Sequence, residues 1–141
     1  MKKINLVAVY GSLRKSMHNH HILMNSKFIG TFDSEPIYTM YSVGGSYPAI
    51  IEGGSTSVLM EIYQVDEAVQ KRLDQLEGYD EQYEDSDNYY SRTILNTPYG
   101  IAYLYLFNDE IKGYKKVDSG DWVQEKENIN KNVINLYSEW D

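Results

Sequence analysis

The sequence predicts one domain, residues 1–141, of the α+β class. Residues 4–10 are almost wholly apolar and β-rich, and a glycine and a serine follow them, as in a buried strand that ends in a loop. Residues 90–96 and 101–107 are strand-like runs joined by a turn with proline and glycine, which indicates a β-hairpin. Residues 66–78 have the spacing of a helix. The remaining expected elements are a short helix (19–25), extended chain (28–41), a short strand around Pro48, a strand (58–65) and a closing helix (122–140).

The helix that follows Asp66 has the clearest sequence signals. Asp66 suits the N-cap, because its carboxylate can accept a hydrogen bond from a free backbone N–H of the first turn. Apolar residues then recur at spacings of four and three, at Val69, Leu73 and Leu76. Gly78 suits a left-handed C-cap. These signals predict both ends of the helix.

Glu77 is the most informative residue of this helix. It lies four residues after Leu73 and eight after Val69, and therefore on the apolar face. Burial disfavours the charged carboxylate, and the negative end of the helix dipole acts in the same direction, so the pKa should rise toward neutrality. Glu77 is thus a candidate general acid and base. The position also suits a side chain that reaches out from the helix end or pairs with Arg92, and spacing alone favours that structural role.

The loop Tyr10-Gly11-Ser12-Leu13 is a second candidate. Glycine allows close approach of the backbone, and consecutive free N–H groups after a strand can bind a carboxylate or a carbonyl oxygen. The same four residues also suit a plain turn between a strand and a helix, and they lack the glycines and lysine of a phosphate-binding loop.

Composition and charge exclude several classes of protein. The formal net charge is -8 and the pI about 4.8, which disfavours nucleic acid and anionic membrane as partners. The absence of cysteine excludes disulfides and the commonest zinc ligands. His18, His20 and His21 lack a matching fourth ligand, and the acidic segment 80–88 departs from a calcium loop, so we expect no metal. The apolar run before Tyr10 is too short for an export signal, which predicts a cytoplasmic protein.

Six segments of the chain resemble, in order, the γ-glutamylcyclotransferase-like family, and in particular its γ-glutamylamine cyclotransferase branch. They are VYGSLRKSMHN (9–19), YPAI (47–50), MEIYQVD (60–66), LDQLEGY (73–79), YSR (90–92) and SGDW (119–122). The chain departs from the family where Ser16 and Met60 replace usual glycines and where Asp80 to Tyr89 contains an apparent insertion. Ordered co-occurrence is more specific than any single segment.

The resemblance implies a small, mostly antiparallel β-barrel with a few flanking helices, and no metal or cofactor. It implies that Glu77 is the catalytic general base and acid, releasing 5-oxoproline and an amine from a small γ-glutamyl substrate. It further implies that Tyr10, Gly11, Ser12, Leu13 and Tyr105 bind the substrate, although a core-packing role for Tyr105 is as well supported. We expect a monomer or weak homodimer.

Two other functions are also compatible with the sequence. The departures from the family leave room for a protein that binds a small molecule without turnover. A tyrosine-rich interaction domain with no pocket is a further reading, since the chain has 14 tyrosines. An exposed Glu77 far from Gly11 would favour that last reading. The acids that follow Gly78 would favour a cationic leaving amine if they overhung the pocket, and would otherwise form a solvated loop.

Overall fold

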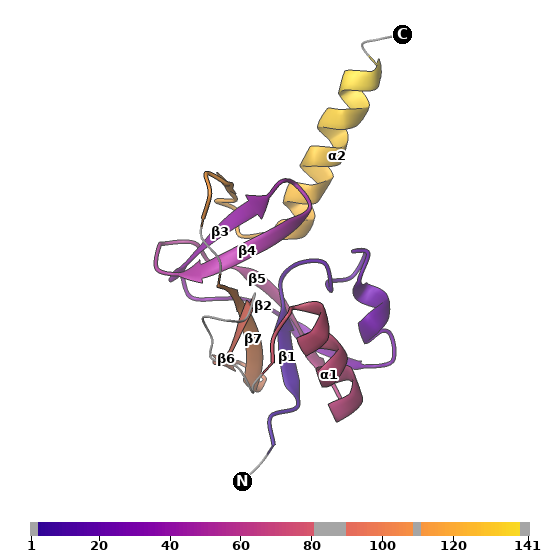
Figure 1. Ribbon diagram of the computed structural model, residues 1–141, viewed down its shortest axis with the longest axis vertical. Helices are drawn as coiled ribbons and strands as arrows, with labels where there is room; N and C mark the ends of the chain where they lie inside the picture. The colour runs from indigo at the N-terminus through magenta and orange to yellow at the C-terminus, as the bar shows by residue number, and fades with distance from the viewer. Residues whose placement is uncertain (1–2, 81–89, 109–110, 139–141) are drawn as a thin grey trace.

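The computed structural model describes residues 3–80, 90–108 and 111–138, with side chains described as far as residue 132 (Figure 1). These residues form strands in two sheets, two α-helices, α1 and α2, and the short 3-10 helix η1 (His20–Leu23), which lies within the expected helix 19–25. Of the acidic segment 80–88, only Asp80 is among the described residues, so the expectations for that segment lie outside them.

The larger sheet has the strand order β2 (Lys27–Asp33), β5 (Leu59–Gln64), β1 (Leu6–Val9), β7 (Gly100–Phe107) and β6 (Tyr90–Thr97). The central strand β1 runs antiparallel to β5 and parallel to β7. Ala8 packs in one core cluster, while Val7 and Val9 pack in another. Because both faces of β1 are buried in a core cluster, its sequence is a continuous apolar run. The hairpin of β6 and β7 pairs over its whole length, as its turn sequence predicts.

The smaller sheet consists of β4 (Tyr47–Glu52), β3 (Tyr38–Val43) and β8 (Lys115–Lys116). The α+β class and the mainly antiparallel pairing are confirmed, but the expected small β-barrel is not closed in the part of the chain that the structure describes. Closure requires hydrogen-bonded pairing of the two edge strands, and β2 and β6 do not pair. At the hairpin tip the Tyr99 hydroxyl donates a 2.8 Å hydrogen bond to the carbonyl of Thr31 in β2.

Helix α1 (Glu67–Leu76) begins and ends where its sequence signals predict. The Asp66 carboxylate accepts a 2.8 Å hydrogen bond from the N–H of Val69. At the other end Gly78 has a φ of 66°, and the N–H of Tyr79 donates to the carbonyl of Asp74 at 2.8 Å. This is a Schellman motif, which needs a left-handed residue after the helix. It fixes the direction of the residue before the glycine, Glu77.

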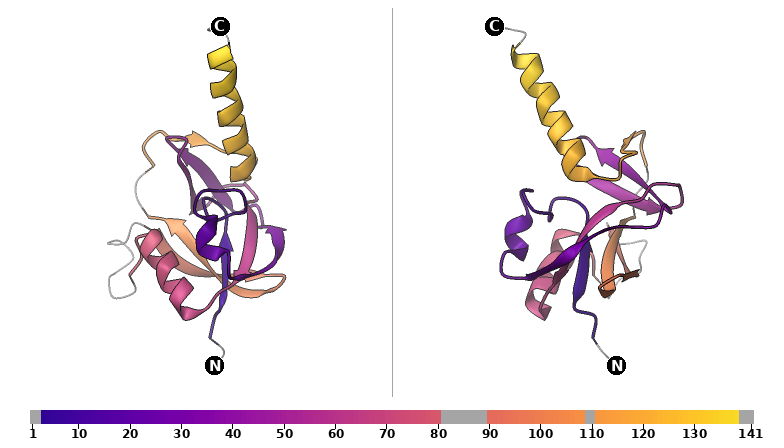
Figure 2. Two further views of the ribbon diagram at one scale, coloured as in Figure 1. Left: turned by 90° about the vertical axis from the view of Figure 1, so that its right-hand side faces the viewer. Right: turned by 180° about the vertical axis from the view of Figure 1, so that it is seen from behind.

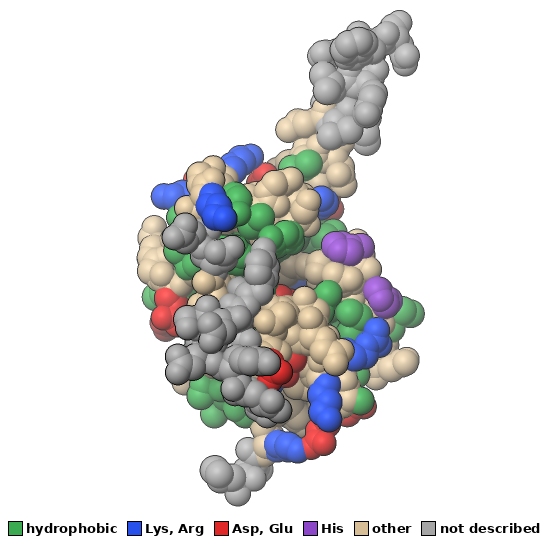
Figure 3. Space-filling model, in the orientation of Figure 1, with side chains coloured by type: hydrophobic (Ala, Val, Ile, Leu, Met, Phe, Trp, Pro, Cys, Tyr) green, Lys and Arg blue, Asp and Glu red, His purple; other side chains and the backbone are tan. Residues whose placement is uncertain are grey.

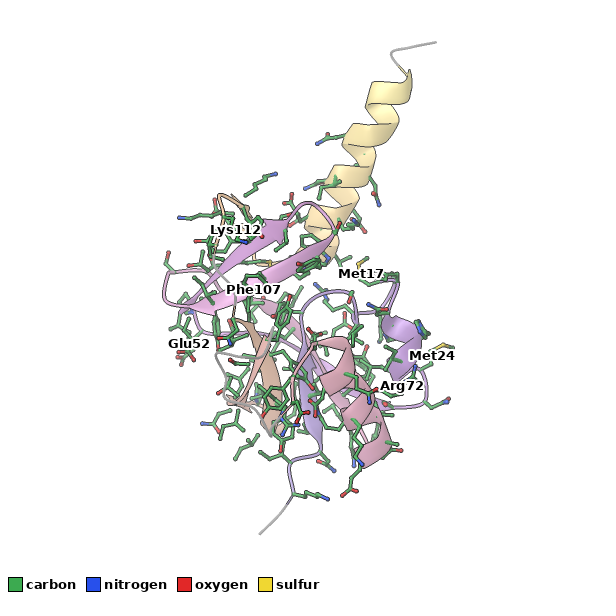
Figure 4. All side chains as sticks on the ribbon, in the orientation of Figure 1. Met17, Met24, Glu52, Arg72, Phe107 and Lys112 are labelled. Atoms are coloured by element: carbon green, nitrogen blue, oxygen red, sulfur yellow. The ribbon has the colours of Figure 1, made fainter. Side chains whose placement is uncertain are left out.

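Helix α2 (Trp122–Ser138) projects from the body of the protein (Figures 1 and 2). It is anchored where it begins, because Trp122 is 1% exposed in the main core cluster. Met17 packs against the same cluster and lies beside the base of the helix (Figure 4). The expected helix over 122–140 is therefore confirmed in its described part, but it does not close over the sheets. No described helix is both long and apolar enough to span a membrane.

Candidate active site

A cavity of about 510 Å³ lies between the loop after β1, the end of α1, the start of β4 and the first turns of α2. Its wall includes all the site residues that the sequence predicts: Tyr10, Gly11, Ser12, Leu13, Glu77 and Tyr105. Glu77 and Gly11 line the same cavity, which contradicts the alternative of a tyrosine-rich interaction domain without a pocket. The remaining question is what each of these residues offers to a ligand.

The loop after β1 presents unused backbone donors at the cavity wall. Its carbonyl groups have partners. The Ser12 carbonyl accepts a 2.9 Å hydrogen bond from the N–H of Asn19, and the Leu13 carbonyl oxygen lies 2.9 Å from the Nδ1 atom of His20. The Asn19 amide also donates to the Ser12 hydroxyl at 3.0 Å. In contrast, the N–H groups of Gly11, Ser12 and Leu13 have no acceptor among the described residues. Three neighbouring donors suit a carboxylate or a developing oxyanion.

Gly11 is required by close packing against β4. A Cβ atom on Gly11 would lie 2.7 Å from Cγ and 2.9 Å from Cδ of Pro48. Pro48 is buried in the strand, and its ring is part of the backbone, so it cannot rotate away. The glycine therefore lets the loop and the start of β4 form adjacent walls of the cavity.

A buried ion-pair network holds this loop in place from behind. The Arg14 guanidinium donates to Glu61 in β5 through Nε and to Asp121 before α2 through Nη1, both at 2.9 Å. The Glu61 carboxylate also accepts the Lys15 N–H at 3.0 Å and the Tyr63 hydroxyl at 2.7 Å. Burial alone would raise the pKa of Glu61, but these hydrogen bonds outweigh it and leave the pKa below its ordinary value. This network was not predicted from the sequence, although the acid Glu61 inside the apolar run of β5 was a signal for it.

Glu77 faces the cavity from the end of α1 and has no ion-pair or hydrogen-bond partner for its carboxylate among the described residues. The predicted alternative, a pair with Arg92, does not form. Arg92 donates instead to Asp74, one helical turn earlier, at 2.8 Å. Burial raises the pKa of Glu77 from 4.5 to about 7. A carboxyl group with this pKa can accept and return a proton near neutral pH.

Three tyrosines of the wall, Tyr10, Tyr90 and Tyr105, have hydroxyl groups that are hydrogen-bonded to the protein. Tyr10 donates to the carbonyl of Tyr105 at 2.6 Å, and Tyr90 donates to the carbonyl of Pro48 at 3.2 Å. The Tyr105 hydroxyl donates to Asp74 at 2.5 Å. Burial, followed by that hydrogen bond, raises the pKa of Tyr105 far above its ordinary value. Tyr105 thus lines the cavity as predicted, but its hydroxyl points to a structural carboxylate.

Several wall residues were not identified from the sequence, and Lys126 is the most important of them. Its ammonium group donates to the Gly45 carbonyl in the turn between β3 and β4 at 2.6 Å. A signal was available, because Lys126 follows Trp122 by four residues and neighbours on a helix face are spaced in this way. His18 also lines the cavity.

The histidine cluster lies on one flank below the base of α2 (Figure 3). The His20 ring packs against Tyr63 with centroids 5.8 Å apart, and its Nδ1 atom faces a carbonyl oxygen. His21 likewise places Nδ1 3.1 Å from the carbonyl of His18. Within the described ranges, no three His, Cys, Asp or Glu side chains are arranged to hold a metal ion. His18 places Nε2 3.2 Å from the side-chain amide nitrogen of Asn19, so all three rings have local contacts.

Comparison with known proteins identifies the family. Residues 7–124 match the family described as γ-glutamyl cyclotransferase, AIG2-like. The γ-glutamylcyclotransferase family protein YtfP of Escherichia coli is 35% identical over 83% of this chain and 95% of its own length. A Vibrio cholerae protein with the provisional name γ-glutamylcyclotransferase is 38% identical over 85% of this chain and 96% of its own length. The chain belongs to this γ-glutamylcyclotransferase family.

Solved structures agree with this assignment. The solution structure of Escherichia coli YtfP superimposes with a TM-score of 0.66 at 34% identity, over 84% of this chain and 96% of that one. The crystal structure of an uncharacterized protein from Pyrococcus horikoshii gives a TM-score of 0.71 at 26% identity, over 92% and 98% of the two chains. The α+β fold with two helices and mixed sheets is therefore that of the family.

Proposed function

We propose that the protein is a γ-glutamylcyclotransferase of the γ-glutamylamine cyclotransferase type, which forms 5-oxoproline and a free amine from γ-glutamyl amines or γ-glutamyl amino acids. One observation carries the proposal: Glu77, with a pKa of about 7, shares a cavity with three backbone N–H groups, and none of these groups has a partner among the described residues. The names of the relatives support the same reaction class. The reaction needs no metal and no organic cofactor.

In the proposed reaction the substrate attacks itself. The Glu77 carboxylate removes a proton from the α-ammonium group, and the free amine attacks the γ-amide carbonyl carbon. A five-membered ring forms, the original amide C–N bond breaks, and Glu77 returns its proton to the leaving nitrogen. The ring nitrogen loses a second proton, which converts the released amine to its ammonium form. Glu77 can take the proton from the α-ammonium group and return it to the leaving nitrogen only if its pKa lies near the working pH.

The loop residues Gly11, Ser12 and Leu13 bind the negatively charged part of the substrate in this proposal. Their N–H groups hold the α-carboxylate or the oxyanion that develops on the attacked carbonyl. The rings of Tyr10 and Tyr105 confine the glutamyl chain, so that the amine stays close to the carbonyl carbon. Proximity of this kind supplies much of the rate enhancement of an intramolecular reaction.

A turnover panel tests the proposal directly. The purified protein is incubated with γ-glutamyl amines and γ-glutamyl amino acids, and 5-oxoproline and the released amine are quantified by mass spectrometry. We expect both products in equal amounts from at least one compound. Saturable binding without either product would instead support the non-catalytic binder. Gel filtration of the same sample tests the expected monomer or weak homodimer, and cell fractionation tests the expected cytoplasmic location.

Two of the departures from the family pattern lie away from the cavity wall. Ser16 is exposed and has a φ of 73°, a left-handed conformation that explains the glycine usual in the family. Met60 is fully buried in the core. Neither residue lines the cavity, so these two departures give the binder reading no specific support.

The loop position can be tested by Gly11→Ala. The new methyl group would collide with Pro48 and displace the backbone donors, so we expect kcat/KM for 5-oxoproline formation to fall about 10- to 100-fold. Steady-state assays of product formation measure the change. Ser12→Ala is the matched control, because it leaves the backbone donors in place and removes only a hydroxyl that accepts from Asn19. Equal losses in the two variants would contradict the role of the backbone donors.

A further inference from the structure

The interior charges of the described residues divide into two groups. Eight charged side chains are at least partly buried: Arg14, Glu61, Asp74, Glu77, Arg92, Asp121, Glu125 and Lys126. Six of them form ion pairs, namely Arg14 with Glu61 and Asp121, Arg92 with Asp74, and Glu125 with the exposed Lys115. Within the described part of the chain, Glu77 and Lys126 are the two that have no ion-pair partner, and both line the same cavity.

Lys126 is held in place with part of its binding capacity unused. Its ammonium group carries three donors, and the hydrogen bond to the Gly45 carbonyl at 2.6 Å uses one of them. The buried Trp122 anchors the start of α2, and the ion pair of Asp121 with Arg14 fixes this start against the loop that follows β1. A partly buried cation without a counter-ion is costly unless a ligand supplies the negative charge.

We propose that Lys126 binds a carboxylate on the leaving amine, so that the preferred substrates are γ-glutamyl compounds that release an amino acid or a peptide. The assignment rests on the proposed function, and specifically on the arrangement in which the loop donors hold the α-carboxylate and Glu77 faces the α-ammonium group. The remaining charge in the cavity is then positive, and it selects a second anionic group. Lys126 lies two residues beyond 7–124, the part that matches the family model.

The acidic segment after Gly78 provides the opposite expectation, a preference for a cationic leaving amine. That expectation rests on residues outside the described ranges, apart from Asp80, which is exposed and does not line the cavity. Lys126 does line it. Substrates that differ only in the charge of the leaving group therefore separate the two expectations.

The experiment compares γ-glutamylalanine with γ-glutamylalaninamide, which have the same shape and differ in one carboxylate, and adds γ-glutamylputrescine as the cationic case. We expect the native protein to favour γ-glutamylalanine over the amide by about 10- to 100-fold in kcat/KM, the range for a hydrogen bond to a charged group. Lys126→Met is expected to abolish the preference and Lys126→Arg to retain most of it. Lys131→Met is the control, since Lys131 is an exposed lysine of the same helix.

Binding of the three compounds is measured by calorimetry in parallel, so the proposal can be judged apart from turnover. Absence of 5-oxoproline from every compound would overturn the proposed function, whereas the binding preference and its loss in Lys126→Met would still support carboxylate recognition. If Lys126→Met lowered kcat/KM and affinity equally for γ-glutamylalanine and its amide, the proposal would be overturned, because Lys126 would then bind the α-carboxylate that both compounds share. A preference for γ-glutamylputrescine would overturn it in favour of the acidic segment.

Discussion

Glu77→Gln is expected to reduce kcat for 5-oxoproline formation about 10²- to 10⁴-fold, the range that general acid and base catalysis contributes. Glutamine keeps the size and hydrogen-bonding capacity of the side chain but cannot carry a proton between the amine and the leaving nitrogen. KM should change little, because the substitution leaves the proposed binding groups in place: the backbone donors of the loop, the tyrosine rings and Lys126. Product formation under saturating substrate measures the effect.

Glu52→Gln is a matched control for this variant, because Glu52 is exposed at the end of β4 and does not line the cavity (Figure 4). Its activity should equal that of the native protein. The native pH profile provides a second readout: kcat/KM should rise with pH, reach half of its plateau near pH 7, where Glu77 is half ionised, and level off above that pH. A folded Glu77→Gln protein with native turnover would eliminate Glu77 as the catalytic group.

The same substitution is expected to stabilise the protein above neutral pH. The pKa of Glu77 is about 7 in the folded state against 4.5 in the unfolded chain, so ionisation favours unfolding. The penalty is absent below about pH 4.5, grows up to about pH 7 and is constant above it, where it amounts to about 3 kcal/mol. Urea unfolding at pH 4.5 and pH 8 should therefore give similar free energies for both proteins at the lower pH, and a more stable variant at the higher pH.

Arg14→Met is expected to lower the free energy of unfolding by about 3–5 kcal/mol at pH 7, because it leaves the buried Glu61 carboxylate without its cation. This is a large part of the stability of an ordinary domain. The folded pKa of Glu61 lies below its unfolded value, so the carboxylate contributes stability above the unfolded pKa and loses it as the pH falls. The difference in the free energy of unfolding between the native protein and Arg14→Met should therefore become smaller in acid.

Arg72→Met is the control for the loss of one arginine, since Arg72 is an exposed residue of α1 (Figure 4). It should change the free energy of unfolding by less than about 0.5 kcal/mol. Adding Glu61→Gln to Arg14→Met should recover part of the loss, because the uncompensated charge is removed together with its partner. If Arg14→Met and Arg72→Met were equally stable, the network would have no structural importance.

Local sequence signals predicted those parts of the fold that short stretches of chain determine. Helix α1 follows from one side-chain cap at Asp66 and one left-handed glycine at Gly78. The hairpin of β6 and β7 follows from its turn, and strand β1 from its apolar run. The open form of the sheets could not be predicted in this way, because it depends on whether β2 and β6 pair across the molecule. No short pattern records that pairing.

The sequence likewise predicts only part of the candidate site. Its loop and Glu77 were predicted from motif order and helix spacing, and both line the cavity. The unpaired state of Glu77 could not be predicted, because Asp74 and Glu77 are both within reach of Arg92 by helical spacing, and only the three-dimensional arrangement selects Asp74. Lys126 enters the cavity through the packing of α2, and it lies beyond SGDW (119–122), the last segment that resembles the family.

The parallel pairing of β1 with β7 has a consequence for the time at which the protein gains its cavity. Leu6 pairs with Ala102, and Ala8 pairs with Leu104, so the central strand is completed by residues almost a hundred positions later in the chain. Asp121, which holds Arg14, is synthesised later still. During translation the first strand must therefore wait unpaired on one side until most of the chain has left the ribosome. Folding that depends on such distant contacts is slow, in the range of milliseconds to seconds, and exposes an apolar strand to chaperones and to aggregation.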